Sequence, residues 1–256
     1  MSFLTVENVG IRFGGLVALA DVSLDVTQGE VYSIIGPNGA GKTTLFNIIS
    51  GLYRPTSGHV RLDGEQITGL APVKLAKAGL RRTFQNLQLC PSMTVIENVM
   101  VGAHLSLPHG FVQGALRFAS LRRAEQSTCH RCEELLDFVG ITRVDHSRLA
   151  GQLPYGAMRR LEIARALAGN PRLLLLDEPA AGLNNSETVE MAELIRKIAR
   201  SATTIVLVEH DMGLVMKVSD RIMVLNYGRT LAIGTPTEIQ NEPHVIAAYL
   251  GEEDPQ

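Results

Sequence analysis

A nine-residue glycine-rich segment constrains this chain more than any other feature. Gly36-Pro37-Asn38-Gly39-Ala40-Gly41-Lys42-Thr43-Thr44 matches the pattern G-x-x-x-x-G-K-[ST] and stands between an apolar run, Val31 to Ile35, and a predicted helix, Thr43 to Ser50. The glycines let backbone N–H groups surround phosphate oxygens, and the helix N-terminus adds a favourable dipole. The segment therefore predicts a nucleotide site to which all nine residues contribute.

Two residues of this segment carry specific expectations. Lys42 is expected to place its ammonium group on the β- and γ-phosphates, which makes it a candidate catalytic residue, and the Thr43 hydroxyl is expected to coordinate Mg²⁺. A chance glycine-rich turn is the alternative. The strand before the segment and the helix after it favour the phosphate-binding interpretation, with ATP and Mg²⁺ as the cofactors.

A pair of acidic residues ends the most apolar run of the chain. Leu173 to Leu176 is apolar on both faces, as expected for a buried strand of a parallel sheet, and Asp177 and Glu178 follow it directly. Asp177 is expected to hold Mg²⁺, and Glu178 to orient or deprotonate the attacking water as a general base. The alternative is a strand that ends in two solvated acids.

The order of the predicted elements indicates an α/β protein. Alternating apolar and polar residues predict half-buried strands at Leu4 to Val9 and at Val22 to Val26. Strand patterns give way to helical ones from about Leu87 to Leu149, and a helix is predicted over Leu121 to Val139. Later apolar runs predict three further buried strands: Leu173 to Leu176, Thr204 to Val208 and Arg221 to Leu225. A helix over Ser186 to Arg200 is predicted between the first two of them.

We therefore expect a P-loop NTPase core of the RecA-like type with an antiparallel β subdomain and an inserted helical subdomain. Residues 1–256 are expected to form a single domain. Its nucleotide-binding lobe is expected to comprise about 1–86 and 166–256, and its helical lobe about 87–165.

With these motifs in this order, the chain resembles the ABC ATPase family over almost its whole length. The resemblance implies that Phe13 stacks on adenine, that Gln85 contacts Mg²⁺ and that His210 is a catalytic residue near the γ-phosphate. It also implies that Ala181-Gly182-Leu183-Asn184 crosses a dimer interface. Simpler interpretations of the first three residues are a core aromatic, a solvated loop residue and a structural histidine.

The signature motif of that family, usually Leu-Ser-Gly-Gly-Gln, is altered here to Leu153-Pro154-Tyr155-Gly156-Ala157. Pro154 has neither a hydroxyl nor an N–H group, but proline is tolerated in the first turn of a helix, and a helix is predicted over Met158 to Leu167. The resemblance implies that Tyr155 and Gly156 contact the nucleotide of a second cassette.

The altered signature resembles that of the ATPases of branched-chain amino-acid importers. Arg12 to Leu16, Arg82 to Asn86, the long insertion around Val101 to Phe118 and the ending Val245 to Gly251 agree with it. The resemblance implies import of a branched-chain or other hydrophobic amino acid. The implied partners are a second ABC ATPase subunit, identical or related, integral membrane permease subunits and, indirectly, a substrate-binding protein. Lipid or lipopolysaccharide export, a non-transport ABC ATPase and a non-catalytic nucleotide-binding scaffold are the alternatives.

Composition and charge argue against several other classes. The formal net charge is -2, so no global positive field attracts nucleic acid. No apolar run approaches the ~20 residues that cross a bilayer, and the N-terminus lacks the pattern of a signal peptide. We therefore expect a cytoplasmic protein, peripheral on the inner face of the plasma membrane. Cys129 and Cys132 lack the second ligand pair of a zinc site and are interpreted as ordinary helix residues.

Overall fold

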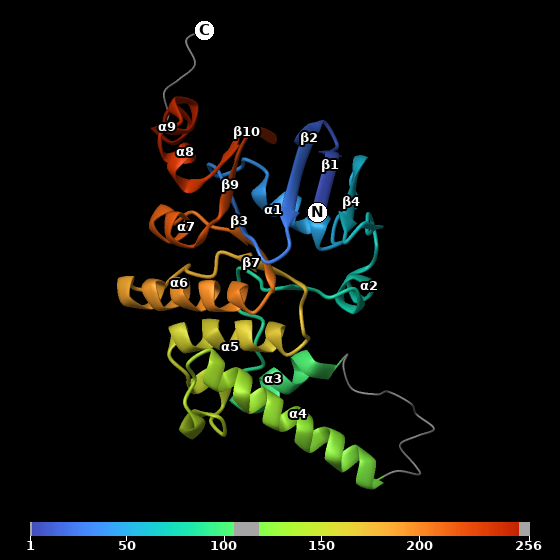
Figure 1. Cartoon of the computed structure of the whole chain (residues 1–256), viewed down its shortest axis with the longest axis vertical. Coiled ribbons are helices and arrows are strands. Elements are labelled where there is room, and N and C mark those ends of the chain that lie inside the picture. Colours follow the sequence, from blue (N-terminus) through green and yellow to red (C-terminus); the bar gives the residue numbers. More distant parts are fainter. Residues whose placement is uncertain (1, 105–117, 251–256) are drawn as a thin grey trace.

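The computed structural model describes residues 2–104 and 118–250, which form two β-sheets and a group of helices (Figure 1). The first sheet is antiparallel, with the order β2-β1-β4-β5. Its strands are β1 (Ser2–Phe13), β2 (Leu16–Thr27), β4 (Ser57–Leu62) and β5 (Glu65–Gln66).

The second sheet has six strands in the order β10-β9-β3-β8-β7-β6, and all its neighbours run parallel except β10 against β9. Its strands are β3 (Val31–Ile35), β6 (Leu80–Arg82), β7 (Leu173–Asp177), β8 (Thr204–Val208), β9 (Arg221–Asn226) and β10 (Arg229–Gly234). These two sheets, together with the helices, confirm the predicted α/β fold class.

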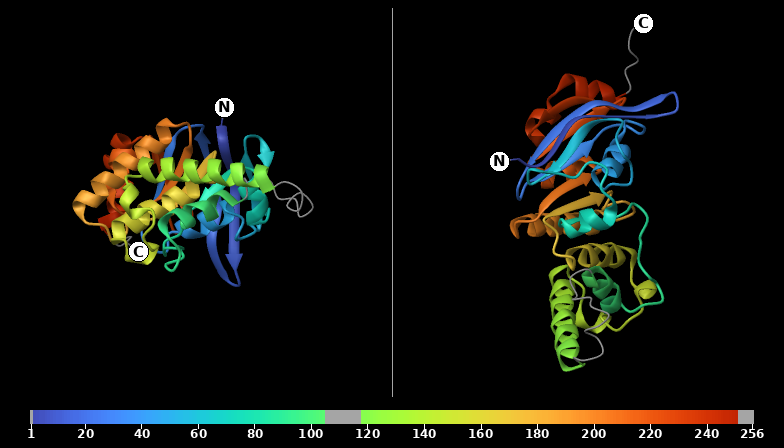
Figure 2. Two further views of the ribbon diagram at one scale, coloured as in Figure 1. Left: turned by 90° about the horizontal axis from the view of Figure 1, so that it is seen from below. Right: turned by 90° about the vertical axis from the view of Figure 1, so that its right-hand side faces the viewer.

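Some helices lie along the sheets, and others form a group at one end of the molecule. Helices α3, α4 and α5 pack together at the end opposite the antiparallel sheet, with the six-stranded sheet between (Figures 1 and 2). The helix bounds are α1 (Lys42–Ile49), α2 (Pro72–Lys77), α3 (Val95–Ala103), α4 (Phe118–Phe138), α5 (Tyr155–Leu167), α6 (Asn185–Arg200), α7 (Met212–Val218), α8 (Pro236–Gln240) and α9 (Pro243–Leu250).

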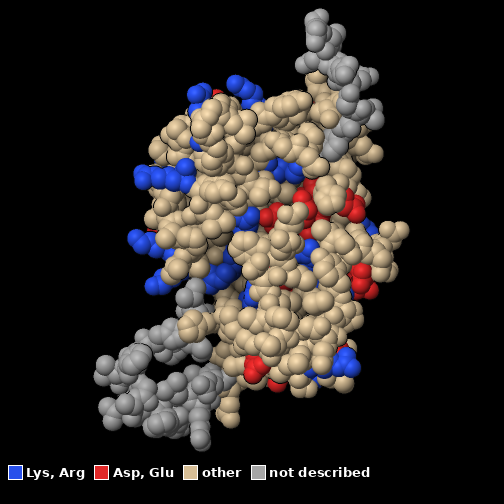
Figure 3. Space-filling view, turned by 180° about the vertical axis from the view of Figure 1, so that it is seen from behind, with Lys and Arg blue, Asp and Glu red and all other residues tan. Residues whose placement is uncertain are grey.

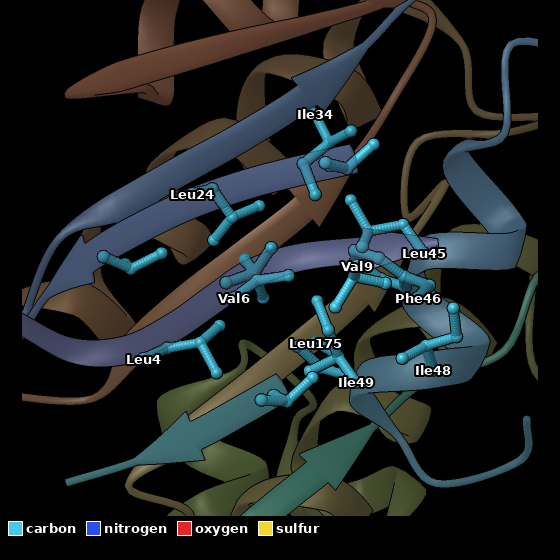
Figure 4. Close-up of a cluster of buried hydrophobic side chains, with 14 of the residues drawn as sticks. Leu4, Val6, Val9, Leu24, Ile34, Leu45, Phe46, Ile48, Ile49 and Leu175 are labelled. Atoms are coloured by element: carbon cyan, nitrogen blue, oxygen red, sulfur yellow. The ribbon is translucent and has the colours of Figure 1, made fainter. Parts of the chain in front are cut away.

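One hydrophobic core lies between the two sheets and around α1 (Figure 4). Side chains of β1, such as Leu4 and Val6, meet Phe46 and Ile49 of α1 and Leu175 of β7, and all five are buried. Burial of such a side chain stabilises the fold by roughly 1.5–3 kcal/mol. This core fixes the start of α1, and therefore the phosphate-binding segment, against both sheets.

A second core covers the other face of the six-stranded sheet. Leu174 and Leu176 of β7 point into it, whereas Leu173 and Leu175 point into the first core. This alternation explains why the strand is apolar on both faces. Cys132 of α4 is buried in the second core, and burial raises the pKa of its thiol to about 11. Its burial agrees with the interpretation of Cys132 as an ordinary helix residue.

Several elements differ from the sequence-based predictions. Three elements were not predicted from the sequence, namely β6, β10 and α2. Strand β6 is only three residues long and β10 is a half-exposed edge strand, so neither has a clear periodic pattern of apolar residues. Helix α5 begins at Tyr155, three residues before the predicted start, so Pro154 is the N-cap residue and does not lie within the first turn. Of the predicted insertion around Val101 to Phe118, residues 105–117 lie outside the described residues.

Two surface properties bear on function. Within residues 2–104 and 118–250, no helix combines the length and the apolar character needed to span a membrane. Lys and Arg side chains gather along one edge of the face shown in Figure 3, and acidic side chains lie near its middle. This face therefore carries both signs of charge, in different places.

Candidate nucleotide site

The glycine-rich segment folds into a tight loop between β3 and α1. Gly36 has φ +147° and Gly41 has φ +104°, a range that side chains rarely adopt. A Cβ atom on Gly36 would lie 2.1 Å from the Leu225 carbonyl oxygen, and one on Gly41 would lie 2.9 Å from the Ala18 carbonyl oxygen. Only glycine fits at both positions, because the loop packs directly against the backbones of β9 and β2.

Helix α1 begins at Lys42, and no side chain caps its N-terminus, so its first N–H groups are available to an anion. The buried Lys42 ammonium group donates hydrogen bonds to the carbonyl oxygens of Gly36 (2.7 Å) and Pro37 (2.9 Å). Burial lowers the pKa of Lys42, and the Glu178 carboxylate opposes that shift. The lysine is thus held inside the loop that it is predicted to serve.

A pocket of about 560 Å³ opens above this loop. Its lining joins the loop to the β1–β2 hairpin, to Gln85 and Glu178, and to the turn between β9 and β10. The Phe13 side chain, at the end of β1, is 44% exposed and meets the Tyr53 ring edge-on, with the ring centroids 5.3 Å apart. Phe13 is therefore a wall of the pocket, and the core-aromatic interpretation is wrong.

Three of the predicted residues meet at one carboxylate oxygen. Gln85 Nε2 donates a hydrogen bond to Glu178 Oε2 at 2.9 Å, and His210 Nδ1 lies 3.8 Å from the same oxygen. The His210 side chain is largely exposed, so it does not serve to fill the core. Residues distant in sequence, from the segments after β6, β7 and β8, are thereby brought together at the carboxyl ends of parallel strands, where α/β folds bind ligands.

The backbone holds Glu178 in a strained conformation. Its φ is +47°, which is uncommon for a residue other than glycine and costs of order 1–3 kcal/mol. The Glu178 N–H group donates to the Val208 carbonyl oxygen at 2.9 Å, so β8 fixes the turn. The end of β8 is fixed by the next residue, Glu209, which is fully buried. Its carboxylate accepts hydrogen bonds from the N–H groups of Ala180 (2.8 Å) and His210 (2.9 Å). The sequence analysis missed Glu209, although it directly precedes His210.

Asp177 is buried in an ion pair that the sequence analysis also missed. Arg82 donates from Nη2 to Asp177 Oδ2 at 2.7 Å, and from Nη1 to Asn47 Oδ1 (2.7 Å) and Ser50 Oγ (2.8 Å) of the α1 region. The side chains of Arg82 and Asp177 are only 7% and 6% exposed. Arg82 thereby joins β6, β7 and the helix that follows the phosphate-binding loop. The only sequence signal was its position three residues before Gln85.

We expect Arg82→Met to destabilise the protein by about 3–5 kcal/mol, because removal of one partner of a buried pair leaves the other charge unpaired. Urea unfolding of the nucleotide-free protein measures this change. Arg172→Met is the matched control, because its ion pair with Asp63 is largely exposed and should contribute less than about 1 kcal/mol. Equal losses in the two variants would contradict the importance given to the buried pair.

The signature segment lies at the N-terminus of α5 and does not line the pocket of its own chain. Tyr155 is partly exposed, and its hydroxyl accepts a hydrogen bond from Arg159 at 2.7 Å. A Cβ atom at Gly182, in the predicted interface loop, would lie 3.0 Å from the Tyr155 ring. Gly156 is buried, and a Cβ atom there would lie 2.5 Å from Glu187 Oε1. Gly156 thus also has a packing role against α6 that the sequence did not reveal.

Two buried residues of α5, Arg159 and Glu162, connect this helix to the segment 84–88, which contains Gln85. Glu162 Oε1 accepts hydrogen bonds from the N–H groups of Phe84 and Gln88, both at 3.4 Å, and Arg159 donates to the Phe84 carbonyl oxygen at 3.4 Å. Burial raises the pKa of Glu162, and these backbone hydrogen bonds oppose the shift. The backbone on both sides of Gln85 is therefore tied to the signature helix. Neither residue was singled out from the sequence.

The fold and the pocket together define a P-loop nucleotide-binding protein, and comparison with known proteins gives its family. A model of the ABC transporter family matches residues 19–181, and a model described as branched-chain amino acid ATP-binding cassette transporter matches residues 229–255. The chain belongs to the ABC transporter family and is an ATP-hydrolysing cassette of that family.

Two curated relatives cover nearly the whole chain. It is 48% identical to the high-affinity branched-chain amino acid transport ATP-binding protein BraF of Pseudomonas aeruginosa, over 97% of this chain and 98% of that protein. It is 34% identical to the probable branched-chain amino acid transport ATP-binding protein LivG of Archaeoglobus fulgidus, over 99% and 97% of the two chains.

Solved structures agree with this assignment. A nucleotide-free ATP-binding cassette from an ABC transporter matches with a TM-score of 0.85 and 32% identity, over 98% of this chain and 100% of that one. A dimeric cassette bound to ADP and Pi in a post-hydrolysis state matches with a TM-score of 0.75 and 28% identity, over 91% and 98%.

Proposed function

We propose that this cassette pairs with a second one, hydrolyses ATP at their interface and drives import of branched-chain or other hydrophobic amino acids through permease subunits. The observation that carries the proposal is the meeting of Gln85, Glu178 and His210 at one carboxylate oxygen beside the phosphate-binding loop. The relatives named for branched-chain amino acid transport support the choice of substrate.

Within the site, we assign Phe13 to the adenine and residues 36–44 to the phosphates, with Lys42 as their main charge. Glu178 then orients or deprotonates the attacking water, and Gln85 donates a hydrogen bond to the Glu178 carboxylate. His210 acts as a catalytic residue near the γ-phosphate. Tyr155 and Gly156, which do not line the pocket of their own chain, serve the nucleotide of the opposing cassette, as the resemblance to the family implies. Catalysis consists mainly of charge stabilisation in a site that excludes water.

The residues present fit Mg²⁺, a hard cation that takes oxygen ligands and keeps part of its coordination for phosphates and water. Thr43 supplies a hydroxyl and Gln85 an amide oxygen, since the Gln85 hydrogen bond to Glu178 uses its Nε2 atom. Asp177 supplies a carboxylate, of which the Oδ2 atom accepts the hydrogen bond from Arg82. Within the described chain, no cluster of three or more His, Cys, Asp or Glu residues forms a separate metal site. When bound, the ion neutralises charge on the phosphates.

We further propose that residues 1–86 and 166–256 form the nucleotide-binding lobe and residues 87–165 the helical lobe. The contacts of Arg159 and Glu162 with the segment 84–88 would transmit movement between them. The cassette would act in the cytoplasm, on the inner face of the plasma membrane, with a substrate-binding protein delivering the amino acid to the permease on the other side.

Phe13→Ala is expected to weaken ATP binding by about 1–3 kcal/mol, the range of base–aromatic stacking. Phe13→Tyr should bind ATP nearly as well as the wild type, and both variants should fold, because the side chain is exposed. Equilibrium binding of a fluorescent ATP analogue measures the change. An unchanged affinity in the alanine variant would remove Phe13 from the adenine site.

Transport is tested by uptake of radiolabelled leucine into cells that lack the gene for this chain. The wild-type gene should restore uptake, and a Glu178→Gln gene should not. Competition by unlabelled isoleucine and valine, with arginine as the unrelated amino acid, tests the substrate class. Uptake that is the same with and without the chain would refute the proposed import function.

A further inference from the structure

The turn between β9 and β10 presents an aromatic side chain at the nucleotide pocket that none of the nucleotide-binding motifs explains. Strand β9 ends at Asn226 and β10 begins at Arg229, so Tyr227 and Gly228 are the two turn residues. Both line the same pocket as Phe13 and the phosphate-binding loop. The Tyr227 side chain is 89% exposed and therefore contributes little to the core.

Tyr227 is an unfavourable residue for this turn. Its φ is +45° and that of Gly228 is +73°, as in a type I′ hairpin turn, whose first central residue is preferentially Asn, Asp or Gly. A bulky aromatic residue with positive φ is an outlier, and such outliers gather at functional sites. The residue is thus strained and exposed at once, so neither backbone preference nor burial accounts for a tyrosine here.

The turn is fixed to the phosphate-binding loop itself. Gly228 donates from its N–H group to the Ala40 carbonyl oxygen at 3.0 Å, and its own carbonyl oxygen accepts a hydrogen bond from the Ala20 N–H group at 2.8 Å. A Cβ atom at Gly228 would lie 2.6 Å from the Ala18 carbonyl oxygen, so only glycine allows this approach. These contacts hold Tyr227 at a constant place relative to the loop and to β2.

We propose that Tyr227 is a second aromatic contact for the nucleoside part of bound ATP, in addition to Phe13, which lines the same pocket. This inference rests on the proposed ATP-binding function and adds a nucleotide-affinity residue to it. An aromatic ring offers a face to any base, and the two side-chain torsions of a tyrosine cost little entropy to order. The ring should therefore contribute to the affinity for nucleosides and not to that for bare phosphate chains.

The test compares Tyr227→Asn with Tyr227→Phe in the full-length chain. Asparagine suits the turn better, so Tyr227→Asn should keep or raise the melting temperature of the nucleotide-free protein, by up to about 4 °C. The same variant should bind ATP about 5- to 100-fold more weakly. Its affinity for inorganic tripolyphosphate should match that of the wild type. Tyr227→Phe should bind ATP as the wild type does.

Wild-type ATP affinity in Tyr227→Asn would overturn the inference while leaving the ATP site intact. An equal loss of ATP and tripolyphosphate affinity would also overturn it, because the residue would then act only through the shape of the phosphate-binding loop. If the wild-type chain itself failed to bind ATP but bound tripolyphosphate, the proposed function would fall together with this contact.

Discussion

Glu178→Gln is expected to lower ATP turnover by about 10²–10⁴-fold, the range lost when a general base is removed. The substitution keeps the size of the side chain, and the glutamine oxygen can still accept the hydrogen bond that Gln85 donates at 2.9 Å. ATP binding should therefore persist. Because the bound ATP is not cleaved, the variant should accumulate as an ATP-bound dimer with its partner cassette.

Phosphate release and the mass of the complex in the presence of ATP measure the two effects. Glu193→Gln makes the same chemical change on the exposed face of α6 and should behave as the wild type. Turnover of Glu178→Gln close to that of the wild type would remove this residue from the role of general base.

Lys42→Ala and Tyr155→Asp are each expected to abolish turnover alone, and their equimolar mixture to recover activity if the chain forms homodimers. An aspartate at the start of α5 favours the helix dipole, so the protein should fold, but its charge would repel the triphosphate of the opposing cassette. About half of the randomly formed dimers contain one chain of each variant. Each of these mixed dimers has one site that joins an intact loop to an intact signature segment and one site in which both are altered. About a quarter of all sites are therefore intact.

Tyr155→Asn is the matched control, since it removes the same ring without adding charge, and it should retain more activity than Tyr155→Asp. Gly156 is less suitable for this test, because a side chain there would first meet Glu187 of its own chain. If this cassette pairs only with a related one, the recovery should appear when the complementary variant is made in that partner. If Tyr155→Asp were as active as the wild type, both as a homodimer and with a related partner cassette, a site shared between two cassettes would be contradicted.

Local motifs made the nucleotide site predictable from the sequence. The spacing of Gly36, Gly41 and Lys42 follows from the need to expose backbone N–H groups to phosphate, so it is visible in one short segment. Asp177 and Glu178 were predictable for a similar reason. They directly follow an apolar run that must be a buried strand, so their position at the end of that strand can be read from one short segment. The buried strands were predictable wherever both faces are covered, as in β7 and β8.

Interactions between distant segments were not predictable in this way. Arg82 reads as a surface charge until β6 is placed beside β7, where it meets Asp177. Glu209 reads as one more acid until the turn after β7 folds over it and supplies the Ala180 N–H group. The packing of Gly156 against Glu187 likewise depends on how α5 and α6 lie together.

The central claim is that this cassette couples ATP hydrolysis to amino-acid import, and reconstitution tests it most directly. Proteoliposomes containing the chain, its partner cassette and the permease would be supplied with binding protein on one side and ATP on the other. Phosphate release and leucine accumulation are measured together. The account predicts that both require ATP and that both are lost with Glu178→Gln. Leucine accumulation that persists with Glu178→Gln, or wild-type ATP hydrolysis that leucine and its binding protein do not change, would contradict it.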